Sequence, residues 1–255
     1  MNKGLLLVII LLVLWWLINP ELFSFNKPYF MSRDDTVKYF VEDKDNYVKD
    51  LSYLDIIALK SSSKEDYVNK IVSDARDFTS EEKERLIKSC AEADKFLYNY
   101  TKIPEINTKK IANMDWVLSK TNGEWYESGY PHTRENIIFI TDEVIRHPDL
   151  TRIMIHEKIH VFERLYPEEI EEWMRVNGYT KHSHLKDYPM ARSNPDVNGV
   201  VYKSKEGCLT LAQFKNKNPS GIDDAIYPCG RDWKHEHPYE TLAYTIDYDY
   251  AGETF

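Results

Sequence analysis

The sequence predicts an α+β protein, and three observations lead to that prediction. Residues 32–100 repeat helix-capping signals that are followed by apolar residues at helical spacing. From residue 102 onward, short β-branched and aromatic runs lie between turn residues, as is typical of strands. A later helix-like stretch carries the pattern His-Glu-x-x-His at positions 156–160. We therefore divide the chain into an apolar segment at 1–25, a helical section at 26–101 and a mixed part at 102–255.

The composition of the chain indicates a globular protein and argues against a nucleic-acid partner. The chain has 255 residues, of which 42% are hydrophobic and 13% aromatic, as expected for a globular protein. Its formal net charge is −9, and no basic run is long enough to follow a phosphate backbone, so we expect no nucleic-acid partner. The cysteines, Cys90, Cys208 and Cys229, are odd in number and lack C-x-x-C spacing. Cys208 and Cys229 can pair in an oxidising compartment, whereas Cys90 fits a small buried residue on a helix.

The N-terminal segment is predicted to be a transmembrane signal anchor. Residues 4–18 form an unbroken apolar run after Lys3, and the tail up to Phe23 brings the segment near the roughly 17–25 residues of a membrane span. Trp15 and Trp16 suit a membrane interface. A cleaved signal peptide, which would leave a secreted protein, is the alternative, but no small-x-small cleavage site follows the run. We therefore predict a single-pass membrane protein.

Capping signals predict the helices of the next section. The pattern Ser/Thr-x-x-Asp/Glu occurs three times, beginning at Ser32, Ser63 and Thr79. The first helix is expected to run towards Asp50. In the third, apolar residues recur at helical spacing from residue 86 to residue 97. The charged residues of this section are interpreted as the solvated faces of helices that pack against the mixed part.

Strand signals begin after residue 102. Residues 116–119 are strand-like, and Asn122-Gly123 marks a turn. Residues 124–127 are expected to return as the second strand of a hairpin. Residues 136–141 are β-branched and aromatic, which predicts a further strand.

The helix that carries the histidine motif is expected to begin near Asp149 or Thr151 and to end before Pro167. Residues 179–235 are rich in Pro, Asn, Gly, Lys and Asp, and we interpret this irregular part as the wall of a binding site. Pro238 fits the first position of a last helix.

The motif itself predicts a metal site. His156 and His160 are four residues apart, so on a helix their imidazoles lie on one face and can reach one Zn²⁺. Glu157 can take a proton from a metal-bound water. Because the flanking residues are apolar, the helix is expected to be buried, and buried imidazoles and carboxylates need a partner. The alternative is two histidines on a half-buried helix without a metal.

A catalytic zinc commonly takes three protein ligands, so a third ligand is expected elsewhere. The metzincin pattern is excluded, because Glu163 and Tyr166 occupy the positions where that pattern has Gly and His. Glu240 is one candidate, although it also fits a first-turn glutamate favoured by the helix dipole. The other candidates are His182, His184, Asp187, His235, Glu236 and His237.

At this point the sequence resembles the gluzincin group of zinc metallopeptidases, in which a glutamate on a later helix completes the site. The matching residues are His156, Glu157 and His160, followed by Glu240 within His-Pro-Tyr-Glu-Thr-Leu-Ala. More loosely, residues 125–250 are similar to uncharacterised zincin-like proteins of large DNA viruses. The resemblance implies a zincin-like catalytic domain, with its active-site helix beside a small mixed sheet.

The resemblance also implies the ligand set. His156, His160 and Glu240 are the expected zinc ligands, with His235 and His237 as the next candidates. Some gluzincins carry an aspartate four residues after the ligand glutamate, which orients the first histidine. Position 244 is tyrosine in this chain, and Asp247 lies one turn further along on roughly the same face. Some hydrogen-bond acceptor for His156 is nevertheless expected.

The reaction implied is hydrolysis of a peptide bond in a peptide or protein substrate, with Glu157 as general base and proton donor to the leaving amine. The oxyanion needs a further donor; the first candidates for this donor or for contact with the substrate are Arg192, Tyr244 and His237. The resemblance also implies that residues 136–141 are an edge strand that binds an extended peptide. The remaining donor candidates are Tyr179, His182, His184 and Tyr188.

Two other functions remain open. One is a catalytically silent zincin fold that acts as a membrane-tethered interaction protein, which the intact Glu157 argues against. The other is a zinc hydrolase with a non-peptide substrate. An open edge strand would favour a peptide, whereas a closed pocket would favour a small molecule.

Overall fold

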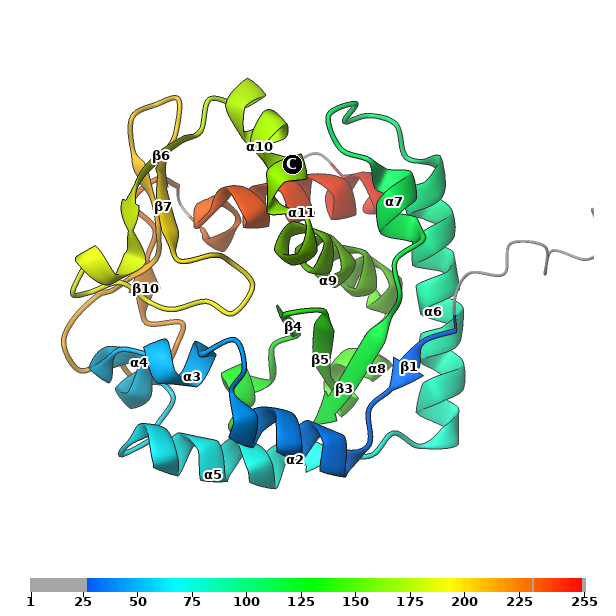
Figure 1. Cartoon of the computed structure of the whole chain (residues 1–255), viewed down its shortest axis with the longest axis horizontal. Coiled ribbons are helices and arrows are strands. Elements are labelled where there is room, and N and C mark those ends of the chain that lie inside the picture. Colours follow the sequence, from blue (N-terminus) through cyan, green and yellow to red (C-terminus); the bar gives the residue numbers. More distant parts are fainter. Residues whose placement is uncertain (1–26, 231, 254–255) are drawn as a thin grey trace, which may run out of the picture.

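A five-stranded mixed sheet and the helix that carries the histidine motif lie at the centre of the fold (Figure 1). The structure is a computed structural model that describes residues 27–230 and 232–253. Helices and small sheets together confirm the predicted α+β class. The helices are α2 (Arg33–Glu42), α3 (Tyr47–Asp50), α4 (Tyr53–Ala58), α5 (Lys64–Asp74), α6 (Ser80–Asn99), α7 (Thr108–Ala112), α8 (Asp142–Arg146), α9 (Leu150–Leu165), α10 (Pro167–Val176) and α11 (Pro238–Ala251).

The central sheet is mixed, with the strand order β1-β3-β5-β4 and with β2 paired to β3. The neighbours β1, β3 and β5 are parallel, whereas β2 and β4 run antiparallel to the strands they pair with. Two smaller sheets, β6-β7-β8 and β9-β10, form the irregular part of the chain. The strands are β1 (Tyr29–Phe30), β2 (Ala75–Arg76), β3 (Val117–Thr121), β4 (His132–Arg134), β5 (Ile137–Thr141), β6 (Thr180–His184), β7 (Val200–Lys203), β8 (Leu209–Thr210), β9 (Gln213–Phe214) and β10 (Ala225–Ile226).

Strand β5 shows how the sheet separates two hydrophobic cores. Successive side chains of a strand point to opposite faces, and every residue of β5 is buried. Ile138 and Ile140 pack with α6, α9 and α11, whereas Ile137 and Phe139 pack with α2, α4 and α5. Both cores therefore combine residues from before and after position 101.

The predicted helix starts are confirmed. Ser32, Ser63 and Thr79 each accept a hydrogen bond from the backbone N–H three residues later, which satisfies one free donor of the first turn. The first helix, however, ends at Glu42 and does not continue to Asp50. Asp43 has φ 41° and Asn46 has φ 59°, so the left-handed backbone at both residues breaks the helix before α3 begins.

The predicted hairpin after β3 is wrong. Residues 124–127 form no strand, and β3 pairs with β1, β2 and β5 instead. The Asp74 carboxylate accepts hydrogen bonds from the backbone N–H groups of Trp125 (2.6 Å) and Tyr126 (3.0 Å). These two donors are thus taken by a side chain distant in sequence, and the chain forms the turn η2 (Tyr126–Gly129).

The strand predicted at 136–141 exists as β5, but it is not an edge strand. β5 lies between β3 and β4, so the backbone hydrogen bonds on both of its sides are used. The strand at the edge of the sheet next to β5 is β4, in which Thr133 pairs with Ile138 of β5.

The predicted membrane location is corrected. Among residues 27–230 and 232–253, the structure contains no helix with the length and apolar character that a membrane span requires. This finding contradicts the prediction of a single-pass membrane protein. The segment at 1–25 on which that prediction was based lies outside the described residues.

Cys208 and Cys229 form a disulfide bond, whereas Cys90 is buried as a free thiol in α6. The disulfide links the start of β8 to the stretch that leads into α11. It therefore fixes part of the irregular wall close to the last helix.

Helix α9, which carries the histidine motif, is attached to α6 by a buried ion pair. The Lys158 ammonium bonds the Asp94 carboxylate, donates to the Ala112 carbonyl at 3.2 Å, and lies 4.2 Å from the centre of the Trp116 ring. The Trp116 indole N–H donates to the second Asp94 oxygen at 2.9 Å. Burial raises the pKa of Asp94 to about 6 and lowers the pKa of Lys158, so removal from water outweighs the attraction between the two charges.

We expect Asp94→Asn to lower the free energy of unfolding by about 3–5 kcal/mol, because it leaves the Lys158 charge buried without its counter-ion. Chemical denaturation of the purified variant measures the change. The double variant Asp94→Leu, Lys158→Met removes both charges and is expected to recover most of the loss. Lys102→Ala breaks an ion pair whose lysine is 67% exposed and serves as the control, with an expected loss below about 1 kcal/mol. A single variant as stable as this control would contradict the prediction.

Candidate metal centre

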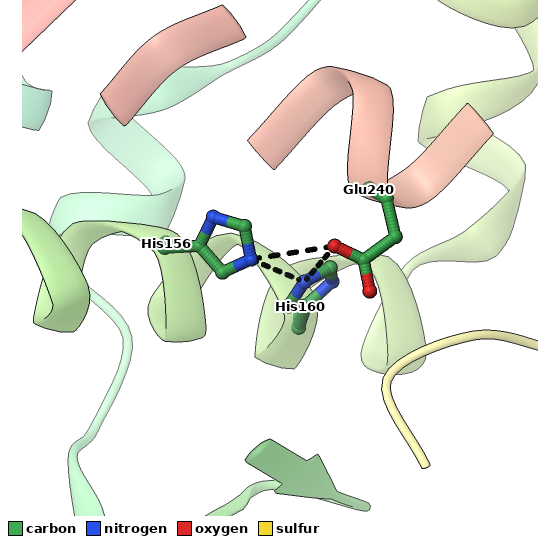
Figure 2. A group of neighbouring side chains, drawn as sticks. All are labelled: His156, His160 and Glu240. Carbon is green, nitrogen blue, oxygen red and sulfur yellow. Dashed lines mark hydrogen bonds and ion pairs between the residues drawn. The ribbon is translucent and has the colours of Figure 1, made fainter. Parts of the chain in front are cut away.

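Three potential metal ligands from two helices meet in the interior (Figure 2). His156 and His160 project from one face of α9, and Glu240 projects from the first turn of α11. The two Nε2 atoms are 3.0 Å apart. Oε2 of Glu240 lies 3.5 Å from Nε2 of His156 and 3.7 Å from Nε2 of His160. The structure thus brings together the three residues that the sequence predicted as ligands.

These separations fit one tetrahedral zinc ion. Zinc binds imidazole nitrogen at about 2.0–2.1 Å and carboxylate oxygen at about 2.0–2.2 Å, which places two ligand atoms of a tetrahedron roughly 3.3–3.5 Å apart. Of the three separations, 3.0 Å lies below this range, 3.5 Å at its upper limit and 3.7 Å just above it. Two imidazoles and one carboxylate also form a usual ligand set of catalytic zinc.

Both histidines are oriented by carboxylates. Nδ1 of His156 donates to Oδ2 of Asp247 at 2.8 Å, and Nδ1 of His160 donates to Oε2 of Glu163 at 2.7 Å. A carboxylate only accepts hydrogen bonds, so the hydrogen of each neutral ring is on Nδ1 and each Nε2 carries a lone pair. When both rings are neutral, two lone pairs and a carboxylate oxygen therefore face one another, an arrangement that a proton or a metal cation between them would stabilise.

The glutamate ligand has an orienting partner of its own. The side-chain amide of Asn194 donates to Oε1 of Glu240 at 2.9 Å, which leaves Oε2 directed towards the histidines. All three candidate ligands are thus held by a residue behind them. Such outer partners fix the orientation of metal ligands.

The electrostatics of the centre favour positive charge. Burial alone would lower the pKa of His156, but hydrogen bonds with Asp247 and Glu240 outweigh it and raise the pKa to about 10. Burial likewise opposes protonation of His160, yet Glu163 and Glu240 raise its pKa well above the usual value. For Glu240, burial is outweighed by the two histidines, which hold the pKa of its carboxyl well below the usual range. A proton, or equally a metal cation, is stabilised between these groups.

Glu157 lies beside the candidate ligands and is held by β4. The Thr133 hydroxyl donates to Oε2 of Glu157 at 3.0 Å and to its backbone oxygen at 3.3 Å. The Glu157 side chain is buried, and burial raises the pKa of its carboxyl. Its position next to His156 and His160 matches the role of base that the motif predicts.

A cavity of about 500 Å³ opens onto this centre. Tyr244 lines it, with its ring centre 4.4 Å from that of His156. Arg192 lines it as well, and its guanidinium donates to Glu236 at 2.6 Å. Two of the three residues predicted as oxyanion or substrate contacts therefore line this cavity.

His237, the third residue predicted as an oxyanion or substrate contact, lies at the start of α11 instead of in the cavity wall. It caps the N-terminus of α11 by accepting from the Tyr239 N–H at 3.1 Å, and its Nε2 bonds Oδ1 of Asn198 at 3.2 Å. Burial lowers its pKa to about 3. It is not among the described residues that line the cavity.

The other candidates are not brought together with His156, His160 and Glu240. His182 and His184 are exposed on β6, Tyr179 lines a separate cavity, and the Tyr188 hydroxyl bonds Ser183. Glu236, a candidate ligand, is instead the partner of Arg192.

Several residues of the centre were not recognised in the sequence. Glu163 is three residues from His160, a helical spacing that offered a signal. Asp247 lies two helical turns after Glu240, and its position on roughly the same face was the signal for it in the sequence. Thr133, Asn194 and Asp196 lie in β4 and in an irregular segment, where spacing gives no signal.

Comparison with protein-family models, with curated proteins and with solved structures found no match. The functional interpretation therefore depends on the geometry and chemistry of the centre itself.

We expect Asn194→Ala, Asp247→Asn and Glu163→Gln each to weaken zinc binding by roughly 10–100-fold, because each removes an orienting partner of a ligand. Competition with a chelator of known affinity measures the change. Asp249→Asn alters a carboxylate that bonds Tyr100 and Lys102 on the other side of α11, and it serves as the control with unchanged affinity. Equal affinities in all four variants would refute the orienting role.

Proposed function

We propose that this chain is a zinc-dependent metallopeptidase of the gluzincin type. One observation carries the proposal: donor atoms of His156, His160 and Glu240 face one another, and each ligand has its own orienting partner. Such an arrangement of buried acceptors is unfavourable without a cation. The predicted zincin-like domain belongs to the same proposal, supported by the position of α9 beside the mixed sheet.

The residues around the centre have distinct roles in this proposal. Zinc, when bound to the three ligands, would polarise a water molecule and lower its pKa. Glu157 accepts a proton as the water attacks the carbonyl carbon, and it then delivers that proton to the leaving amine. The bond from Thr133 keeps the Glu157 carboxylate in place. The raised pKa of Glu157 makes it a better proton acceptor.

Tyr244 is the best placed of the candidate donors to the oxyanion. It packs on the ring of a ligand, lines the cavity, and stays protonated because burial and the neighbouring carboxylates raise its pKa. Arg192 is a substrate-contacting residue at the cavity wall. His237 acts as a helix cap, which supports the fold of the ligand helix.

Two observations bear on the alternative functions. Glu157 is present and is positioned by Thr133, which argues against a silent interaction protein. A hydrolase with a compact non-peptide substrate is the second candidate, because the Asp196 carboxylate already accepts a hydrogen bond from the Thr133 N–H of the edge strand β4. Comparison of amide and ester substrates of the same shape separates the two hydrolases.

The wild-type chain is expected to purify with about one zinc ion, and Glu240→Ala is expected to lose most of it, because one of three protein ligands is removed. Elemental analysis measures the metal content. Glu206→Ala changes an exposed glutamate and is the control. Substoichiometric zinc in the wild type would refute the proposal, and unchanged zinc in Glu240→Ala would place the third ligand elsewhere.

Glu157→Gln is expected to keep its zinc and to lose peptide hydrolysis by about 10²–10⁴-fold, the range for loss of a general acid–base group. Release of amines from a randomised peptide pool measures the rate, and zinc analysis of the same sample confirms loading. Retained turnover in the zinc-loaded variant would show that Glu157 is not the base.

A further inference from the structure

The edge strand β4 presents one backbone donor towards the cavity. In an antiparallel pair, the N–H groups point alternately towards the partner strand and away from it. The Thr133 N–H donates to the Asp196 side chain, which lies outside the sheet, so this N–H points away from β5. The N–H groups of His132 and Arg134 therefore point towards β5. Position 131 is proline, which has no N–H. A peptide that added to β4 as a further strand would therefore find only one backbone N–H donor on β4, that of Thr133.

Asp196 occupies that donor. Its Oδ1 accepts from the Thr133 N–H at 2.5 Å, in the place that the carbonyl oxygen of an added strand would take. The Thr133 hydroxyl bonds Glu157, so this backbone position is adjacent to the proposed base. Asp196 is 8% exposed and lines the same cavity as Glu157.

The segment that carries Asp196 is fixed on both sides. The Ser193 N–H and hydroxyl both donate to Asp55 at 2.9 Å. Asn194 bonds Glu240 and also accepts from the Asp196 N–H at 2.9 Å. Arg164 of α9 donates to the Val197 carbonyl at 3.1 Å. The carboxylate is therefore built into the cavity wall.

We propose that Asp196 is a specificity-determining residue that closes β4 to strand addition and restricts the site to short peptides. What remains for recognition is the cavity of about 500 Å³ and its side chains, a size within the usual range for compact ligands. The inference rests on the proposed peptidase function and names the substrate class of that site.

The test compares full-length wild type, Asp196→Ala and Asp196→Asn on randomised pools of blocked tripeptides and decapeptides. We expect Asp196→Ala to raise the decapeptide-to-tripeptide ratio of kcat/KM by about tenfold through KM, since one backbone hydrogen bond becomes available. Asp196→Asn keeps an oxygen that accepts from Thr133, so it should retain the wild-type ratio. Asp34→Ala removes a carboxylate that is 94% exposed and does not line the cavity, and it is the matched control. An unchanged ratio in Asp196→Ala would overturn the inference.

A second measurement does not depend on turnover. Fluorescence polarisation of the labelled decapeptide pool is measured with Glu157→Gln protein, with and without Asp196→Ala, after thermal melting has shown that both are folded. About tenfold tighter binding with Asp196→Ala supports the inference, and equal or absent binding overturns it. If Asp196→Ala does not fold, Asp196→Ser, which shortens the side chain but keeps it polar, replaces it. Failure of the peptidase proposal is recognised separately, by missing zinc or missing hydrolysis in the wild type.

Discussion

The candidate metal centre depends on one electrostatic constraint: three electron-rich atoms lie close together in the interior of the protein. Nε2 of His156, Nε2 of His160 and Oε2 of Glu240 lie within 3.0–3.7 Å of one another. Hydrogen bonds on the far side of each ring fix the lone pairs inward, so rotation of the rings does not relieve the repulsion. Only positive charge between the three atoms makes this arrangement favourable. The carboxylates of Asp247 and Glu163 also favour positive charge at this point, because they place negative charge directly behind the two histidine rings.

The fold holds the two helices against this repulsion. Helix α9 is fixed to α6 by Lys158 and Asp94, in the turn of α9 that lies between the two histidines. Helix α11 begins at a proline and is capped by His237, so the first turn, which carries Glu240, is well ordered. Apolar residues of both helices share one core. Packing therefore sets the distance between the helices, and the ligand geometry follows from that distance.

The sequence predicted those parts of the centre that depend on local spacing. His156, Glu157 and His160 follow from helical periodicity, and Glu240 followed from the resemblance together with Pro238 at a helix start. Residues outside regular spacing were missed. Asn194 reaches Glu240 from an irregular segment 46 residues earlier, and Asp196 reaches Thr133 across 63 residues. The false hairpin has the same cause, because Asp74 takes backbone donors 51 and 52 residues further along. Such contacts are set by tertiary packing, which no local pattern encodes.

The short segment of residues 194–196 contacts both the candidate metal centre and the edge strand β4. Asn194 holds the ligand Glu240, and two residues later Asp196 closes the edge of β4. The Asp196 N–H bonds the side chain of Asn194, so the two contacts share one turn of backbone. Displacing Asp196 would therefore disturb Asn194, which orients the candidate ligand Glu240. In the proposed function, opening the edge of β4 and holding a metal at Glu240 would oppose each other.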